Sequence, residues 1–152
     1  MDVILNPIGY VVSSRAEAVD DGWDAETSHI QLDERFTEDA LVGLDGFSHV
    51  EVVYHFHLVP ESEEVPGSRH PRDRSDWPRV GIFAQRGKVR PNRIGVTVCK
   101  IVGVVGTTVH VQGLDAIDAT PVLDLKPHMP EFGPRGEVRS PGWSKELMAD
   151  YW

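Results

Sequence analysis

The chain has 152 residues and a mass of 16.9 kDa, which suits one ordinary domain with a hydrophobic core. Hydrophobic residues make up 40% of the chain and charged residues 26%, which argues against disorder. The sequence has no apolar run of about 18 residues and no secretory signal, so we expect a cytoplasmic protein without a membrane partner. The net charge of −9, taken alone, argues against a nucleic-acid partner, and the single cysteine, Cys99, excludes an internal disulfide.

Most of the chain is predicted to form short strands separated by Gly, Pro and Asp. The expected strands, in chain order, are Val3–Ser13, His49–His57, Val80–Ala84, a hairpin of Gly95–Val105 with Thr108–Gln112, and Pro121–Leu125. Short helices are expected at Thr37–Val42 and at Ser144–Tyr151, the second with Ser144 as its N-cap. Glu61–Asp76 is expected to be a long loop. Strands without long amphipathic helices between them predict a mainly β fold, a barrel or a sandwich.

Charge is distributed unevenly along the chain. Residues 1–66 hold 2 basic and 15 acidic side chains, whereas residues 67–100 hold 9 basic and 2 acidic ones. A cationic segment inside an acidic protein attracts phosphate or carboxylate ligands. The alternative is an arginine-rich loop whose side chains pair with the acidic N-terminal third.

Several common site motifs are missing. No Rossmann fingerprint, P-loop or nucleophile elbow is present. His55 and His57 would share one face of a strand and would suit a metal, but no further ligand motif accompanies them, so we expect hydrogen-bonded histidines and no metal. Cys99, in an apolar strand, is expected to be a buried, inert thiol.

Two segments carry chemical information. Gly81–Gly95 runs from a strand through a loop with three arginines, a lysine and an asparagine, and Pro91 stiffens that loop, so its forked donors suit a carboxylate or a phosphate. In Gly113–His128, a tight turn leads into a strand on which Asp124 and Lys126 share one face. This pair is either a polar pair for one ligand or a surface salt bridge.

Both segments resemble the signatures of the YaeB-like (TsaA-like, TrmO) family, G-[IV]-F-A-x-R…R-P-N-x-I-G and L-D-x-x-D-G-T-P-V-x-D-[IL]-K-P-Y. Ile8–Gly9 and Gly46–His49 match as well, so the resemblance covers nearly the whole chain. It implies a single-sheet β-barrel over residues 1–152 without a C-terminal extension domain, and a homodimer. It also implies S-adenosyl-L-methionine as methyl donor and N6-methylation of threonylcarbamoyladenosine in tRNA.

The resemblance also assigns site residues. It places the cofactor against Gly22, His57, Leu58, Arg86, Arg90, Asp118, Ala119, Thr120 and Pro121. Asn92, Asp124 and Lys126 are assigned to the reaction. Methyl transfer from a sulfonium needs mainly positioning, since the cofactor supplies the leaving group. Asp124 is the first candidate for the acceptor of the N6 proton, and His128 is the second.

The chain departs from the family pattern at three motif positions. Arg93 replaces a proline, Ala119 replaces a glycine that would tolerate positive φ, and His128 replaces a tyrosine. Three functions are therefore kept apart: a tRNA methyltransferase, a methyltransferase of the same fold with a small substrate, and a non-catalytic module that binds S-adenosyl-L-methionine.

Overall fold

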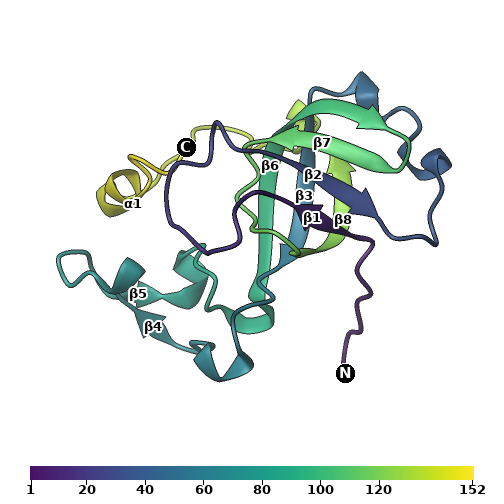
Figure 1. The fold of residues 1–152 in the computed structure, drawn as a ribbon. Coiled ribbons are helices and arrows are strands. Elements are labelled where there is room, and N and C mark those ends of the chain that lie inside the picture. Colours follow the sequence, from purple (N-terminus) through teal and green to yellow (C-terminus); the bar gives the residue numbers. More distant parts are fainter.

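The computed structural model describes residues 1–152 and contains a closed antiparallel β-barrel (Figure 1). Around the barrel the strand order is β1-β2-β7-β6-β3-β8, and β8 pairs with β1 to close it. The six strands are β1 (Gly9–Val12), β2 (Thr27–Leu32), β3 (His49–His55), β6 (Ile94–Val105), β7 (Thr108–Gln112) and β8 (Pro121–Pro127). The predicted mainly β barrel is confirmed.

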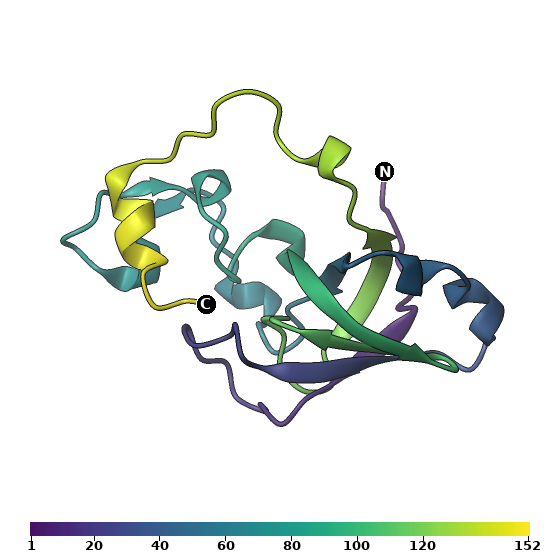
Figure 2. The same ribbon diagram turned by 90° about the horizontal axis from the view of Figure 1, so that it is seen from above.

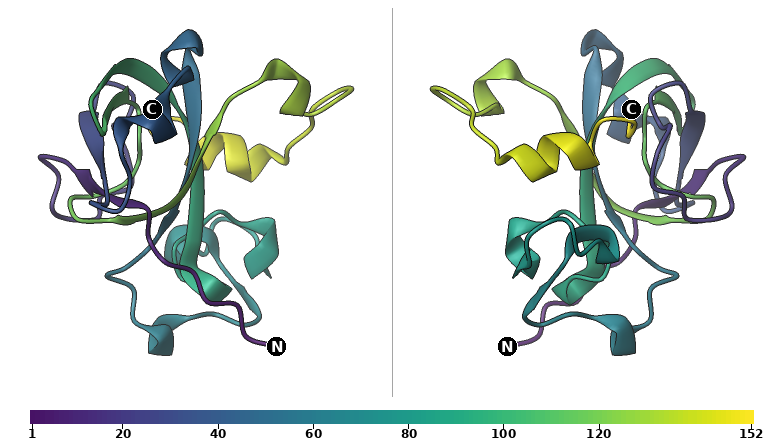
Figure 3. Two further views of the ribbon diagram at one scale, coloured as in Figure 1. Left: turned by 90° about the vertical axis from the view of Figure 1, so that its right-hand side faces the viewer. Right: turned by 90° about the vertical axis from the view of Figure 1, so that its left-hand side faces the viewer.

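A small lobe and a C-terminal helix lie outside the barrel. The lobe holds the two-stranded sheet of β4 (Ser68–Arg69) and β5 (Val80–Gly81), and the helix is α1 (Gly142–Leu147). Figure 2 shows the chain between β8 and α1 arching away from the barrel towards the lobe, and Figure 3 shows the lobe and α1 on the same side of the barrel. The Trp77 indole of the lobe donates a 2.8 Å hydrogen bond to the Glu146 carboxylate of α1, which ties the two together.

Seven short 3₁₀ turns connect these elements: Glu38–Leu41, Leu44–Gly46, Glu61–Glu63, Pro71–Asp73, Ile82–Ala84, Pro91–Arg93 and Pro130–Phe132. None of the helices has the length and apolar character needed to cross a lipid bilayer.

Side chains that point inward from alternate positions of the strands fill the barrel. In β3 every second residue is buried, and β2, β7 and the first half of β6 follow the same period, as expected where successive side chains point to opposite faces. The interior is made of β-branched and aliphatic side chains with one tyrosine and one cysteine; its fully buried members are Val11, Ile30, Val50, Val52, Val109, Val111, Leu114 and Val122.

The twelve-residue strand β6 pairs with two neighbouring strands. Its first half pairs with β3 and its second half with β7, and the register with β7 shifts between Ile101 and Gly103. A bulge of this kind bends a strand and increases its twist, which lets β6 turn the corner of the barrel. Near the start of β6, Gly95 sits against the Tyr54 ring; a Cβ there would lie 2.6 Å from Tyr54 Cζ, so only glycine fits without movement.

The predicted boundaries were wrong at several elements. β1 starts only at Gly9, beyond Pro7, which lacks the N–H that a strand ladder needs. Strand β5 has two residues and continues into a 3₁₀ turn, and Thr37–Val42 forms only the 3₁₀ turn Glu38–Leu41.

Three further elements of the structure differ from the sequence prediction. The C-terminal helix starts at Gly142 with Pro141 as its N-cap, and Ser144 lies inside it. The predicted loop Glu61–Asp76 holds β4 and two 3₁₀ turns. Strand β2 was not predicted, although its alternation is regular in the fold.

Candidate functional site

Strands β6, β3 and β8 bring the two motif segments to one end of the barrel. Near the end of β3, Tyr54 lies opposite Gly95 of β6 on one side and opposite Val122 of β8 on the other. The Pro91–Arg93 turn directly precedes β6, and Pro121 begins β8. Both segments therefore flank the same end of β3, about two strand spacings apart.

The turn before β6 is tightly held. Arg90 donates a 2.7 Å hydrogen bond to the Gln85 carbonyl, and Asn92 and Arg93 have left-handed φ values of 64° and 51°. Arg93 donates a 2.7 Å hydrogen bond to the Val59 carbonyl and pairs with Glu64 at 2.9 Å. Proline cannot adopt a φ of 51°, so Arg93 gives this turn a backbone that the family's proline would not allow.

His57 and Leu58 follow β3 in the segment that Arg93 anchors. The Nδ1 atom of His57 is buried without a hydrogen-bond partner, and burial lowers the pKa of this imidazole. Burial, and then the Arg93 charge, lower the pKa of His55. Leu58 is 64% exposed. The two histidines do not share a strand face, because β3 ends at His55, which corrects that expectation.

The corner before β8 is wrapped by the chain after β1. The Ser13 amide donates to the Asp118 carboxylate at 3.0 Å, and the Ala119 amide donates to the Val11 carbonyl at 2.8 Å. Thr120 is buried. Ala119 has a φ of 64°, so the residue that replaces the family's glycine does take the conformation that glycine favours.

Gly22 joins this corner through Arg15. The Arg15 carbonyl accepts a 2.6 Å hydrogen bond from the Asp118 amide, and its guanidinium donates to the Gly22 carbonyl and stacks 4.2 Å from the centre of the Trp23 ring. The structure thus brings Gly22 to the Asp118 corner, whereas no hydrogen bond or ion pair joins that corner to Arg90.

A half-buried carboxylate, Asp115, lies against Tyr54 near this end of β3 and was not among the predicted site residues. Asp115 accepts hydrogen bonds from the hydroxyls of Tyr54, at 3.1 Å, Thr97 and Tyr151. Burial, and then the Asp115 charge, raise the pKa of both tyrosines. Tyr54 could have been suspected from its inward position in β3, but nothing in the sequence indicates that Tyr151 reaches the barrel.

Asp124 and Lys126 form a pair on the outer side of β8. The Lys126 ammonium lies 2.6 Å from one Asp124 oxygen, and the other oxygen accepts a 2.9 Å hydrogen bond from the Leu125 amide. The hydrogen bond of Lys126 to Asp124, and then the Asp124 charge, raise the pKa of Lys126. Lys126 also lies opposite Glu51 of β3, whose carboxylate is 3.5 Å from His128 Nδ1. Glu51 had not been selected from the sequence.

The cationic segment is partly neutralised inside the fold. Four of its nine basic residues form ion pairs: Arg69 with Asp73, Arg72 with Asp20 and Asp21, Arg74 with Asp76, and Arg93 with Glu64. Arg86 instead donates a 2.8 Å hydrogen bond to the Val96 carbonyl. Of these pairs, those of Arg72 and Arg93 reach the acidic N-terminal part of the chain. Exposed cations without an ion pair remain at Arg79, Arg86, Lys88 and Lys100.

Comparison with known proteins adds the family. Residues 18–133 match the model of the tRNA-methyltransferase O N-terminal domain. A Pyrococcus abyssi protein named as a probable S-adenosyl-L-methionine-binding protein is 32% identical over 147 residues, covering 93% of this chain and 76% of its own. The Escherichia coli tRNA (adenine(37)-N6)-methyltransferase is 38% identical over 96 residues, covering 60% of this chain and 40% of its own.

The fold is also found in solved structures. The crystal structure of TrmO from Pseudomonas aeruginosa superimposes with a TM-score of 0.74 at 30% identity, over 91% of this chain and 62% of that one. The chain thus spans less than two thirds of the relatives that carry the methyltransferase name.

Proposed function

The chain belongs to the family of the tRNA-methyltransferase O N-terminal domain, and from this membership we propose that it methylates N6 of threonylcarbamoyladenosine, beside the anticodon of tRNA, with S-adenosyl-L-methionine as donor. The observation that carries the proposal is that the Pro91–Arg93 turn and the Asp118–Pro121 corner flank the same end of β3, one on each side. With tRNA as substrate, we also propose that the protein acts in the cytoplasm.

The residues at this end suit a sulfonium nucleoside. His57 Nδ1 is a buried polar atom that lacks a partner, Asp118 has engaged one carboxylate oxygen in the 3.0 Å bond from Ser13, and Leu58 offers an exposed apolar surface. Such groups would hold the cofactor's hydroxyls, base and apolar parts together with Arg90 and Thr120. When bound, S-adenosyl-L-methionine supplies an activated methyl group on a good leaving group.

The rest of the chemistry is positioning and the removal of one proton. We assign the N6 proton to the Asp124 carboxylate, which Lys126 holds in place at 2.6 Å, and we place Asn92 beside the substrate. Orientation of two reactants can supply about 7–11 kcal/mol, so a strongly shifted base is not required. The free cations Arg79, Lys88 and Lys100 would engage tRNA phosphates.

We also propose a homodimer that covers the cofactor end. Leu58 and Phe83 are 64% and 76% exposed. They belong to segments that bond to Arg93 and Arg90, through the Val59 and Gln85 carbonyls. A second subunit seated there would bury both side chains. Light scattering of the wild type and of Phe83→Glu tests this, since a charge at the interface should yield monomers.

The decisive experiment combines calorimetry with a transfer assay. Wild type should bind S-adenosyl-L-methionine and methylate tRNA that carries threonylcarbamoyladenosine. Arg90→Ala should weaken cofactor binding at least tenfold, whereas the exposed Arg139→Ala should not; Asp124→Asn should slow transfer and leave cofactor binding nearly intact. Binding without transfer would favour the non-catalytic module. Absence of cofactor binding refutes the proposal.

A further inference from the structure

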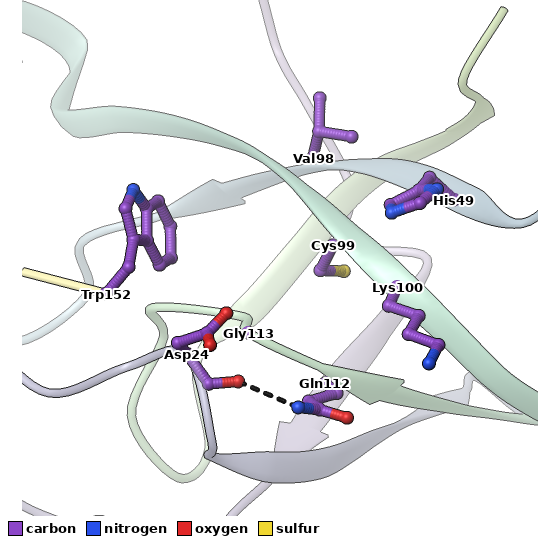
Figure 4. A pocket seen from close by; sticks show the side chains of 8 residues that line it. All are labelled: Asp24, His49, Val98, Cys99, Lys100, Gln112, Gly113 and Trp152. Atoms are coloured by element: carbon purple, nitrogen blue, oxygen red, sulfur yellow. Dashed lines mark hydrogen bonds between the residues drawn. The ribbon is translucent and has the colours of Figure 1, made fainter.

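A cavity lies between Trp152, at the end of the chain, and the outer side of β6. Its volume is about 240 Å³, and Figure 4 shows the side chains around it. The polar and aromatic lining comes from Asp24, His49, Lys100, Gln112 and Trp152, with Val98 of β6 on its wall. The Trp152 ring lies on one side of the cavity and the Lys100 side chain on the other.

The Trp152 indole is held in place yet accessible. Its ring meets the Tyr151 ring edge-on at 4.9 Å, and Tyr151 is fixed by a 2.9 Å hydrogen bond from the Trp23 amide to its carbonyl and by its own hydroxyl on Asp115. Trp152 remains 51% exposed. A positioned, half-exposed indole is a surface on which a planar ring can stack.

The polar groups of the cavity are mostly uncommitted. Gln112 donates a 3.0 Å hydrogen bond to the Asp24 main-chain carbonyl, which orients its amide and leaves the amide oxygen free to accept. The Asp24 carboxylate and the Lys100 ammonium form no ion pair within the chain. One stacking face, two acceptors and one cation therefore surround the same small space.

The volume of the cavity and the chemistry of its lining indicate which class of ligand it would bind. Pockets for drug-sized ligands measure roughly 300–1,000 Å³, so this smaller cavity suits a single planar ring system rather than a whole cofactor. Proteins read single-stranded RNA by stacking splayed bases on aromatic side chains and bonding their edges. Asp24 and Gln112 would accept from the amino groups of a base, and Lys100 would contact a phosphate.

The cavity also lies near Arg86, a basic residue of the cationic segment 67–100. Arg86 donates to the Val96 carbonyl, two residues before Val98 on β6, so a lobe cation lies about 7 Å along the strand from the cavity wall. An RNA strand whose phosphates follow the lobe would thus pass the cavity. Resting on the proposed function, we propose that this cavity receives one unstacked base of the substrate RNA, with its ring on Trp152 and its donor edge on Asp24 and Gln112.

Fluorescence anisotropy with a labelled anticodon stem-loop RNA tests the cavity. Stacking of one base predicts that Trp152→Ala binds the RNA roughly 5- to 150-fold more weakly, and that Trp152→Phe stays within about threefold of wild type. Phe132→Ala is the matched control, because Phe132 is an 81% exposed aromatic residue outside the cavity, and it should bind as wild type does. Adenosine monophosphate, added as competitor, separates a free nucleotide from an RNA base as the ligand.

The outcomes separate the two proposals. Equal RNA affinity in wild type and Trp152→Ala, no measurable affinity in wild type, or complete competition by micromolar adenosine monophosphate overturns the base-binding cavity. Calorimetry with S-adenosyl-L-methionine, measured on the same variants, should show unchanged binding. If wild type neither binds the cofactor nor transfers methyl groups, the proposed function fails, while an RNA affinity that falls selectively in Trp152→Ala still supports the cavity.

Discussion

Replacing Gly95 with alanine should destabilise the barrel at the cofactor end. A Cβ at this position would lie 2.6 and 2.7 Å from Tyr54 Cζ and Cε2, and 2.9 Å from the Phe56 ring. Carbon atoms in contact normally lie about 3.5–4.0 Å apart, so the tyrosine ring would have to move by about 1 Å. Tyr54 is only 3% exposed, and little free space surrounds it.

The expected loss follows from these contacts. Overpacking in a core costs about 1–3 kcal/mol. Movement of the ring also weakens the hydrogen bonds of the Tyr54 hydroxyl to the Asp115 carboxylate and carbonyl, at 3.1 and 3.2 Å, each worth about 0.5–1.5 kcal/mol. We therefore expect Gly95→Ala to lower the free energy of unfolding by about 2–4 kcal/mol.

Urea denaturation followed by circular dichroism measures this loss. Gly103→Ala is the control, since it lies on the same strand with nothing within 4 Å of its added Cβ, and it should stay within about 0.5 kcal/mol of wild type. In a Tyr54→Leu background the cost of Gly95→Ala should shrink, because the clashing ring is gone. A Gly95→Ala protein as stable as Gly103→Ala would refute the steric argument.

Three further predictions concern other positions. Ala119→Gly should raise the free energy of unfolding by about 0.5–1 kcal/mol in the same urea assay, because a φ of 64° costs an L-residue more than glycine loses in chain entropy; a less stable variant would contradict this. Burial and the Asp115 charge raise the pKa of Cys99 to about 12, so a thiol reagent at pH 8 should label it only after unfolding, and rapid labelling of the folded protein would show the thiol to be accessible. Burial lowers the pKa of His57 below 6.5 in the folded protein. As the pH falls, the imidazole is therefore protonated in the unfolded chain before it is protonated in the folded protein. The stability that the neutral imidazole contributes is complete above pH 6.5 and is lost as the pH falls through the folded pKa. Unfolding curves of wild type and His57→Gln between pH 7 and 5 should converge as the pH falls, and parallel curves would contradict the shift.

The sequence was most informative where side-chain alternation and motifs coincide. The hairpin of β6 and β7 and the burial of Cys99 were predicted correctly, because period-two patterns in Val-rich segments survive into the fold. The positive φ of Ala119 followed from the residue type that the family has there. Local chemistry of this kind needs no knowledge of distant contacts.

Long-range contacts explain what was missed. Asp115 is an ordinary loop aspartate in the sequence, and it becomes a half-buried acceptor of three hydroxyl groups only because β3, β6 and the chain end converge on it. Likewise, the C-terminal helix starts at Gly142, before the expected N-cap Ser144, and its Glu146 accepts a hydrogen bond from the distant Trp77 of the lobe. The ion pairs that neutralise Arg72 and Arg93 also join distant segments.

Closure of the barrel between β1 and β8 has a kinetic consequence. Gly9 pairs with Val122, so the first strand stays without one of its two neighbours until nearly the whole chain is available. Topologies dominated by such distant pairings fold slowly, in milliseconds to seconds, because loop closure must precede the contacts that reward it. During synthesis, therefore, β1 emerges from the ribosome with an open edge and can mature only after β8 has followed.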